Sequence, residues 1–117
     1  MTMIVGQSNN GKAMKRNAMK DSWVLIKHWG FTKADALRQG WLIARAQHYM
    51  KTRKYCYFEF LKTDGKTYRK AFGTINPHFT PPTKGARTTP PTQQVFFDME
   101  KKEWRSFRKS NLIRILM

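Results

Sequence analysis

The sequence predicts an α+β domain in which a helical hairpin precedes a small antiparallel barrel of about five strands. Apolar residues recur every three to four positions up to residue 51, and they alternate singly after residue 53. All five prolines fall between residues 77 and 91, which marks one long loop. A chain of 117 residues suits one domain. We therefore assign residues 1–53 to a lead-in and a two-helix hairpin, and residues 54–117 to a barrel with a Pro-rich loop at 76–92. Together they should form one compact unit.

The first helix is predicted over residues 12–29. Its apolar stripe recurs at helical spacing, Gly30 is a suitable stop, and cations occupy the other faces. Residues 1–11 are expected to be a flexible lead-in, with Ser8 or Asn10 capping the helix. The stripe consists of Met14, Ala18, Ser22, Leu25, Ile26 and Trp29.

The second helix should run roughly over residues 33–51. Thr32 is placed to cap it, with Asp35 three residues later. The short turn between the helices predicts a hairpin. The packed face is expected to contain Leu37, Trp41, Ala44 and His48, with Ala36, Gly40 and Ile43 beside it.

The remaining elements are strands. Residues 54–62 alternate, which places Cys56, Phe58 and Phe60 on one buried face. The residues TDGK (63–66) predict a hairpin turn, because Asp-Gly suits positive φ. Residues 67–75 form the returning strand, and either of its faces could be the inner one. Three further strands are expected at 93–99, 104–109 and 112–117, so that a meander closes into a small barrel.

The segment FEFLKTDGKTYRKAFGTIN resembles a motif of small WYL-like proteins of Bacteroidota phages and mobile elements. WRSFRKSNLIRI resembles the closing strands of WYL-type barrels, and MKDSWVLIK with ALRQGW resembles the helices ahead of them. The resemblance implies an SH3-like (Sm-like) barrel and a phage-like origin, and it implies no activity. The matching motif positions are Phe58, Phe60, Lys62, Asp64, Gly65, Arg69, Ala71, Gly73 and Thr74.

Charge favours nucleic acid as the partner. The chain has 23 lysines and arginines against seven acidic residues, a formal net charge of +16. Basic residues neutralise phosphates and release condensed counterions. Anionic membranes and acidic proteins are the rival partners, although the apolar stripe of the basic first helix should be used in packing. No run approaches the roughly 18 apolar residues of a membrane span. The single cysteine and the lack of a signal-peptide pattern predict an intracellular protein, in the cytoplasm of a bacterial host.

An enzyme is not expected, and no cofactor or metal is predicted. Gly6 to Lys12 has the G-x-x-x-x-G-K spacing of a phosphate-binding loop, but Ala13 replaces the hydroxyl residue that binds Mg²⁺. The predicted strands form hairpins, whereas such a loop needs a parallel sheet. His28, His48, His78 and Cys56 are scattered, without a metal-ligand spacing.

The predicted function is binding of nucleic acid without catalysis, with RNA or single strands favoured because no base-reading helix-turn-helix is evident. Single strands are held by cations interleaved with aromatic platforms. For any single residue a structural role remains open: the tyrosines could pack under the helices, and Arg69 and Arg105 could support the barrel. The site residues are Arg105, Arg108, Lys109, Arg69, Lys70, Tyr55, Tyr57, Tyr68, Lys84, Arg87, Lys12, Lys15 and Arg16.

A second hypothesis is an inhibitor of host defence. A small, basic, phage-like protein could act as an anti-CRISPR by binding an RNA-guided nuclease or its guide RNA. Size, charge and the family resemblance motivate this alternative.

Overall fold

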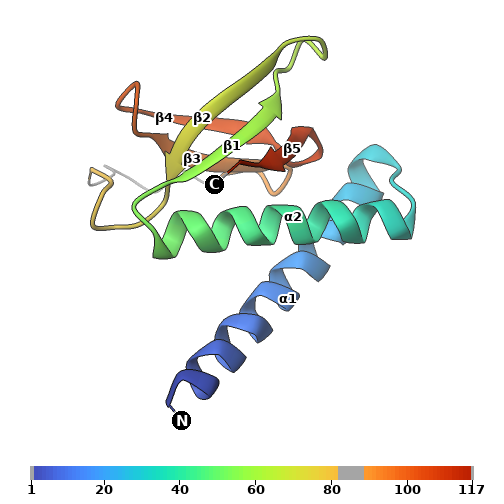
Figure 1. The fold of residues 1–117 in the computed structure, drawn as a ribbon. Coiled ribbons are helices and arrows are strands. Elements are labelled where there is room, and N and C mark those ends of the chain that lie inside the picture. Colours follow the sequence, from blue (N-terminus) through green and yellow to red (C-terminus); the bar gives the residue numbers. More distant parts are fainter. Residues whose placement is uncertain (1, 82–88, 117) are drawn as a thin grey trace.

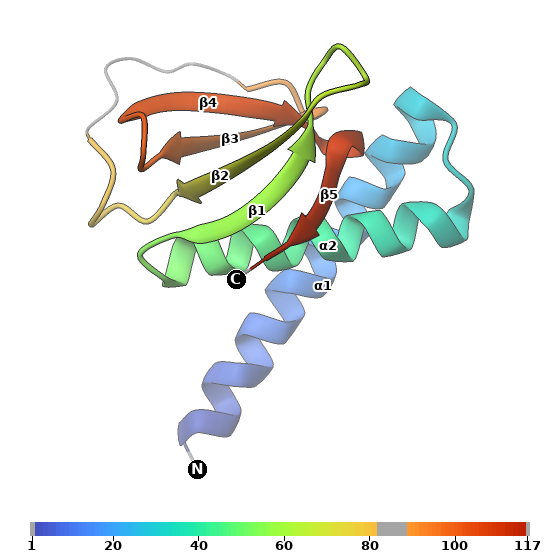
Figure 2. The same ribbon diagram turned by 45° about the horizontal axis from the view of Figure 1, so that its top comes forward.

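The computed structural model describes residues 2–81 and 89–116, with side chains from residue 12 onward. Two helices precede five strands (Figure 1). The N-terminal half of α1 extends away from the sheet, and α2 lies along the sheet (Figures 1 and 2). The elements are α1 (Thr2–Trp29), α2 (Lys33–Thr52), β1 (Cys56–Leu61), β2 (Tyr68–Thr74), β3 (Gln93–Asp98), β4 (Glu103–Arg108), the 3₁₀ turn η1 (Lys109–Asn111) and β5 (Leu112–Ile115).

The strands form one antiparallel sheet in the order β4-β3-β2-β1-β5 (Figure 2). Strands β1 to β4 make a meander, and η1 then carries the chain across to pair β5 with β1. Two helices followed by this sheet confirm the α+β, SH3-like fold.

The core lies between α2 and the inner face of the sheet. Phe58 and Phe60 of β1 point inward, and their rings contact Phe96 and Phe107 of β3 and β4. Ala71 and Gly73 of β2, which lie opposite Phe58 and Cys56, face inward as well, and this settles which face of β2 is the inner one. A Cβ on Gly73 would lie only 2.7 Å from Phe58 Cε1, so this glycine makes room for the aromatic core.

The helices meet at small residues. A Cβ on Gly40 would lie 2.5 Å from the carbonyl oxygen of Ala18, so the α2 backbone rests directly on α1. The predicted turn is confirmed: Gly30 has a φ of +69°, and the Thr32 hydroxyl accepts a hydrogen bond from the backbone N–H of Asp35.

Two helix predictions are wrong. α1 begins at Thr2 rather than near residue 12, so the segment Gly6 to Lys12 is helical and forms no phosphate-binding loop. Ser8 and Asn10 lie inside the helix and therefore do not cap it. The glycines of this segment do not end the helix, because each lowers helix propensity by only about 1 kcal/mol. In α2 the packed face is shifted by one position. Leu37 and Trp41 are exposed, whereas Ala36, Gly40 and Ile43 are buried.

The hairpin between β1 and β2 forms as predicted. Gly65 has a φ of +73°, and the Asp64 carboxylate accepts hydrogen bonds from the backbone N–H groups of Lys66 and Thr67 and from the Thr67 hydroxyl. These bonds, chiefly that of the hydroxyl, lower the pKa of Asp64 to about 2. No helix in the described part of the chain is long and apolar enough to cross a membrane.

Candidate nucleic-acid interface

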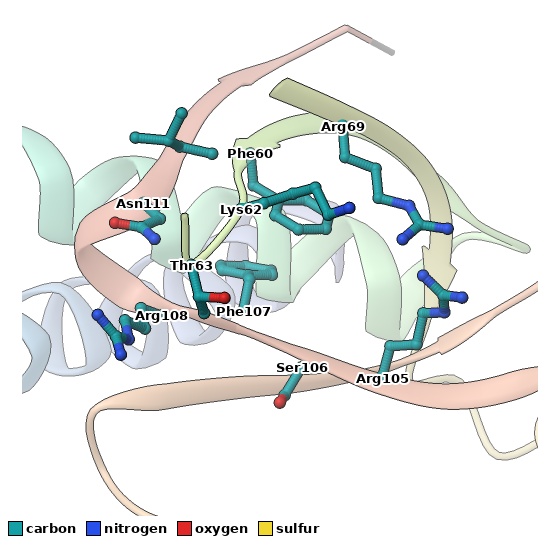
Figure 3. Close-up of a pocket in the computed structure, with 10 residues that line it drawn as sticks. Phe60, Lys62, Thr63, Arg69, Arg105, Ser106, Phe107, Arg108 and Asn111 are labelled. Atoms are coloured by element: carbon teal, nitrogen blue, oxygen red, sulfur yellow. The ribbon is translucent and has the colours of Figure 1, made fainter. Parts of the chain in front are cut away.

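A pocket of about 240 Å³ opens at one end of the barrel, where β4 approaches the β1–β2 hairpin. Figure 3 shows its cations around two phenylalanine rings. The lining residues are Phe60, Leu61, Lys62, Thr63, Arg69, Arg105, Ser106, Phe107, Arg108 and Asn111.

Strand register places these side chains. Arg69 lies directly opposite Phe60 in the β1–β2 ladder, so both point to the same face. Arg105 and Phe107 are two residues apart on β4 and therefore share a face as well. The rings of Phe60 and Phe107 stack with their centroids 5.4 Å apart and form the apolar floor. The Arg69 and Arg105 side chains converge from β2 and β4 on one side of this floor (Figure 3).

The pocket keeps a positive excess. Arg105 is held by Glu103, with Nη2 2.6 Å from Oε1, and its Nε lies 3.7 Å from Asp98 Oδ2. Within residues 2–81 and 89–116, no ion pair forms between an acidic side chain and Lys62, Arg69 or Arg108. The carboxylates of Asp98 and Glu103 both lie at Arg105, so the four cations of the pocket exceed the nearby acidic groups by two.

This arrangement suits a group that is both anionic and partly apolar. Guanidinium groups donate paired hydrogen bonds to phosphate oxygens, and the two phenylalanine rings, which are 6% and 4% exposed, leave a small apolar surface between the cations. The volume lies below the range of about 300–1,000 Å³ typical of pockets for drug-sized ligands, so one phosphate or one base fits rather than a large molecule.

The predicted aromatic residues do not join the pocket. Tyr57 and Tyr68 alternate with the inward residues and lie on the outer face of the sheet, away from α2. The alternative role, in which the tyrosines pack under the helices, is therefore excluded for these two residues. Tyr57 stacks on Phe72 with ring centroids 4.3 Å apart and is half-buried, so it is less open than predicted. Tyr55 and Tyr68 are exposed, and Lys70 lies on the same outer face opposite Glu59.

Lys109 is misassigned by the sequence prediction. It is buried, and its Nζ donates a hydrogen bond to Asp21 Oδ1 at 2.7 Å. It follows the inward-facing Phe107 by two residues, so the alternation of β4 also places it on the inner side, where its side chain reaches Asp21 of α1. It therefore holds the barrel to the helices and is not available to a ligand.

The remaining predicted cations lie elsewhere. Lys84 and Arg87 lie outside the described residues. Lys12, Lys15 and Arg16 are exposed on α1, but they lie in the middle of this helix rather than at its N-terminal end, because the helix begins at Thr2.

Sequence reasoning missed Lys62 and the phenylalanine floor as parts of the site. Lys62 stands directly before the TDGK turn, and its position at the end of the predicted hairpin was the sequence feature that could have indicated a role in binding. Phe60 was predicted only as a core residue and Phe107 was assigned no role, and both belong to the core.

The candidate catalytic and metal residues stay apart. Cys56 is fully buried, and burial raises the pKa of its thiol to about 11, which keeps it protonated at neutral pH. In the described ranges no three His, Cys, Asp or Glu side chains gather as a metal site.

Comparison with known proteins gives one match. A family model described as WYL_2, Sm-like SH3 beta-barrel fold, matches residues 43–113. This segment contains the second half of α2 and nearly the whole barrel, including every pocket residue. No curated protein and no solved structure matches the chain. The match gives no indication of a phage origin or of a nuclease partner, so these stay predictions.

Proposed function

The chain belongs to the WYL_2 family, of Sm-like SH3 β-barrel fold, and on this basis we propose that it binds nucleic acid through its barrel-end pocket without catalysis. The WYL domain family is associated with nucleic-acid binding. We define the barrel-end pocket by its cations Lys62, Arg69, Arg105 and Arg108 over Phe60 and Phe107.

The observation that carries the proposal is that four cations line one pocket over two phenylalanine rings, with Arg69 and Arg105 converging on one side of it (Figure 3). Three of them come from strands β2 and β4, whose backbones are fixed by the sheet, so the pocket is preorganised. A net charge of +16 surrounds the pocket with a field that attracts polyanions and speeds their association.

Single strands and RNA suit this pocket better than duplex DNA. A pocket that admits one phosphate or one base requires a nucleotide that can leave the stack, which unpaired residues do at little cost.

A mobility-shift titration of a 20-nucleotide single-stranded RNA at low salt tests the proposal. We expect submicromolar binding that Arg69→Gln/Arg108→Gln weakens at least about tenfold, because two phosphate-binding groups are lost while a polar, uncharged side chain is kept at each position. The matched control is Lys66→Gln/Lys101→Gln, which removes two exposed cations outside the pocket. Absence of binding below micromolar protein, or equal losses in both variants, would contradict the proposal.

A further inference from the structure

The two helices carry the same short pattern twice. Residues 18–27 read AMKDSWVLIK, and residues 36–45 read ALRQGWLIAR. In both copies a tryptophan stands five residues after a buried alanine. One cation lies three residues before the tryptophan, and another lies four residues after the tryptophan. The repeated positions are Met19 and Leu37, Lys20 and Arg38, Trp23 and Trp41, and Lys27 and Arg45.

The crossing of the helices relates the two copies to each other. Gly40 rests on α1 between Ala18 and Ser22, since an added Cβ would lie 2.5 Å from the Ala18 oxygen and 3.3 Å from the Ser22 nitrogen. Ser22 and Gly40 hold the same place in the pattern, so the helices cross at equivalent residues. The short turn after Trp29 makes α2 run back past α1 (Figure 1).

In such an antiparallel pair, the residue after each contact position points to one side of the pair and the residue before it points to the other. The residues directly before the contact positions, Asp21 and Gln39, face the barrel. Asp21 accepts a hydrogen bond from Lys109 Nζ, and Gln39 Nε2 donates to the Lys109 carbonyl oxygen at 2.9 Å. The following residues, Trp23 and Trp41, therefore lie beside the crossing on the side away from the barrel.

These tryptophans are exposed. The exposed fractions are 64% for Trp23 and 37% for Trp41, and Met19 and Leu37 one turn earlier are exposed as well. Asp35 is the only exposed acidic residue on the described parts of α1 and α2, and it pairs with Arg38. We call Met19, Trp23, Leu37 and Trp41, with the flanking cations Lys20, Lys27, Arg38 and Arg45, the tryptophan face.

We propose that the tryptophan face is a second nucleic-acid contact, on which bases of a single strand stack against Trp23 and Trp41 while the flanking cations meet its phosphates. The inference rests on the proposed binding of nucleic acid but not on the barrel-end pocket. Aromatic platforms beside cations hold single strands with little sequence preference, because every base offers a flat face.

Charge and pattern favour this occupant over others. A second copy of the chain would bring a surface of the same sign against the face, since both copies carry +16. A helix lying on a membrane needs a continuous apolar stripe, whereas the stripes of α1 and α2 are buried in their own contact. Each copy of the repeat offers a strand both an indole for a base and a cation for a phosphate.

The test compares Trp23→Ala/Trp41→Ala with the control Phe79→Ala/Trp104→Ala, which removes two exposed aromatic side chains outside both surfaces. The probes are a labelled 20-nucleotide oligouridylate and an RNA duplex of the same length. We expect the first variant to lose at least about tenfold in affinity for the single strand and little for the duplex, whose bases are already stacked. The control should bind both probes as the unmodified chain does.

Fluorescence separates stacking from a structural role. Adding oligouridylate should quench the tryptophan emission of the unmodified chain. Trp23→Phe/Trp41→Phe should remove most of this quenching and bind within a few-fold of the unmodified chain, because a phenyl ring also stacks. Quenching that persists in this variant would overturn the inference.

The outcomes distinguish the two surfaces. If Arg69→Gln/Arg108→Gln weakens RNA binding and Trp23→Ala/Trp41→Ala does not, the tryptophan face is overturned and the barrel-end pocket stands. The reverse result supports the tryptophan face and overturns the pocket as the binding site. If the tryptophan variant loses binding only to phosphatidylserine vesicles or to an acidic protein, the inference is overturned. An unmodified chain that binds no RNA overturns both.

Discussion

Lys109 is the only buried lysine or arginine among the described residues. Its ammonium group meets the Asp21 carboxylate, which is 95% buried as a side chain and has its second oxygen without a partner. A charge removed from water in this way stays tolerable only while its counter-charge is present. The pair therefore ties the loop after β4 to the middle of α1.

Breaking this pair on one side should be more harmful than removing it altogether. We expect Lys109→Met to lower the free energy of unfolding by about 3–5 kcal/mol, because it leaves the Asp21 charge buried and unpaired. Adding Asp21→Asn to Lys109→Met should recover much of that loss. Urea unfolding of the single and double variants measures both effects, and additive losses would contradict this explanation.

At the residue scale the sequence predicted the pocket only in part. Arg69, Arg105 and Arg108 were identified from charge and strand position, and register brings them together. The misassignment of Lys109 has a physical reason: its partner lies 88 residues away in the chain, and no local pattern reveals such a contact. The tyrosines were predicted as platforms because alternation shows that they share a face, but it does not show which face the pocket occupies.

At the scale of elements, patterning predicted every strand to within two residues or so, because alternation and the Asp-Gly turn are local signals. Helix α2 is the instructive exception. Large apolar residues were expected to mark its packed face, yet its backbone contacts α1 at Gly40, where a small residue allows the closest approach. The larger Leu37 and Trp41 are left exposed on the tryptophan face.

Gly40→Ala tests the helix crossing. At an exposed helical site this change would stabilise by up to about 1 kcal/mol through helix propensity. Here the new Cβ would lie 2.5 Å from a backbone oxygen that cannot rotate away, so we expect a loss of about 1–3 kcal/mol in the free energy of unfolding. Thermal or urea denaturation measures it, with Ala34→Gly at an exposed position of α2 as the control for propensity alone. A more stable Gly40→Ala variant would show that the helices do not cross at this residue.

At the scale of the molecule, the class of partner was predicted from the net charge, which follows from composition alone. The charge favoured a polyanionic partner without locating the contact, because cations are spread over both halves of the chain. The fold then separates them into the barrel-end pocket, the outer sheet face around Lys70 and the tryptophan face.

Salt dependence measures how many of these cations meet phosphates. For single strands the slope of log K against log salt is about −0.7 per neutralised phosphate. We expect Arg69→Gln/Arg108→Gln to make the slope shallower by about 1.4, from two lost contacts. Titrations at four or more salt concentrations give the slope, and the Lys66→Gln/Lys101→Gln control should keep that of the unmodified chain. An unchanged slope in the arginine variant would show that these side chains bind no phosphate.

The contact between Asp21 and Lys109 also has a consequence for synthesis of the chain on the ribosome. The helices emerge first, but Asp21 of α1 has no partner until Lys109 has been made. Likewise, the side chain of Gln39 has no acceptors until Lys109 and Leu112 have been added. Strand β1 likewise receives its second neighbour only from β5. A nascent chain that has passed residue 53 therefore holds helices without their final contacts, and both halves reach their native packing in a late step, after residue 112 has been added.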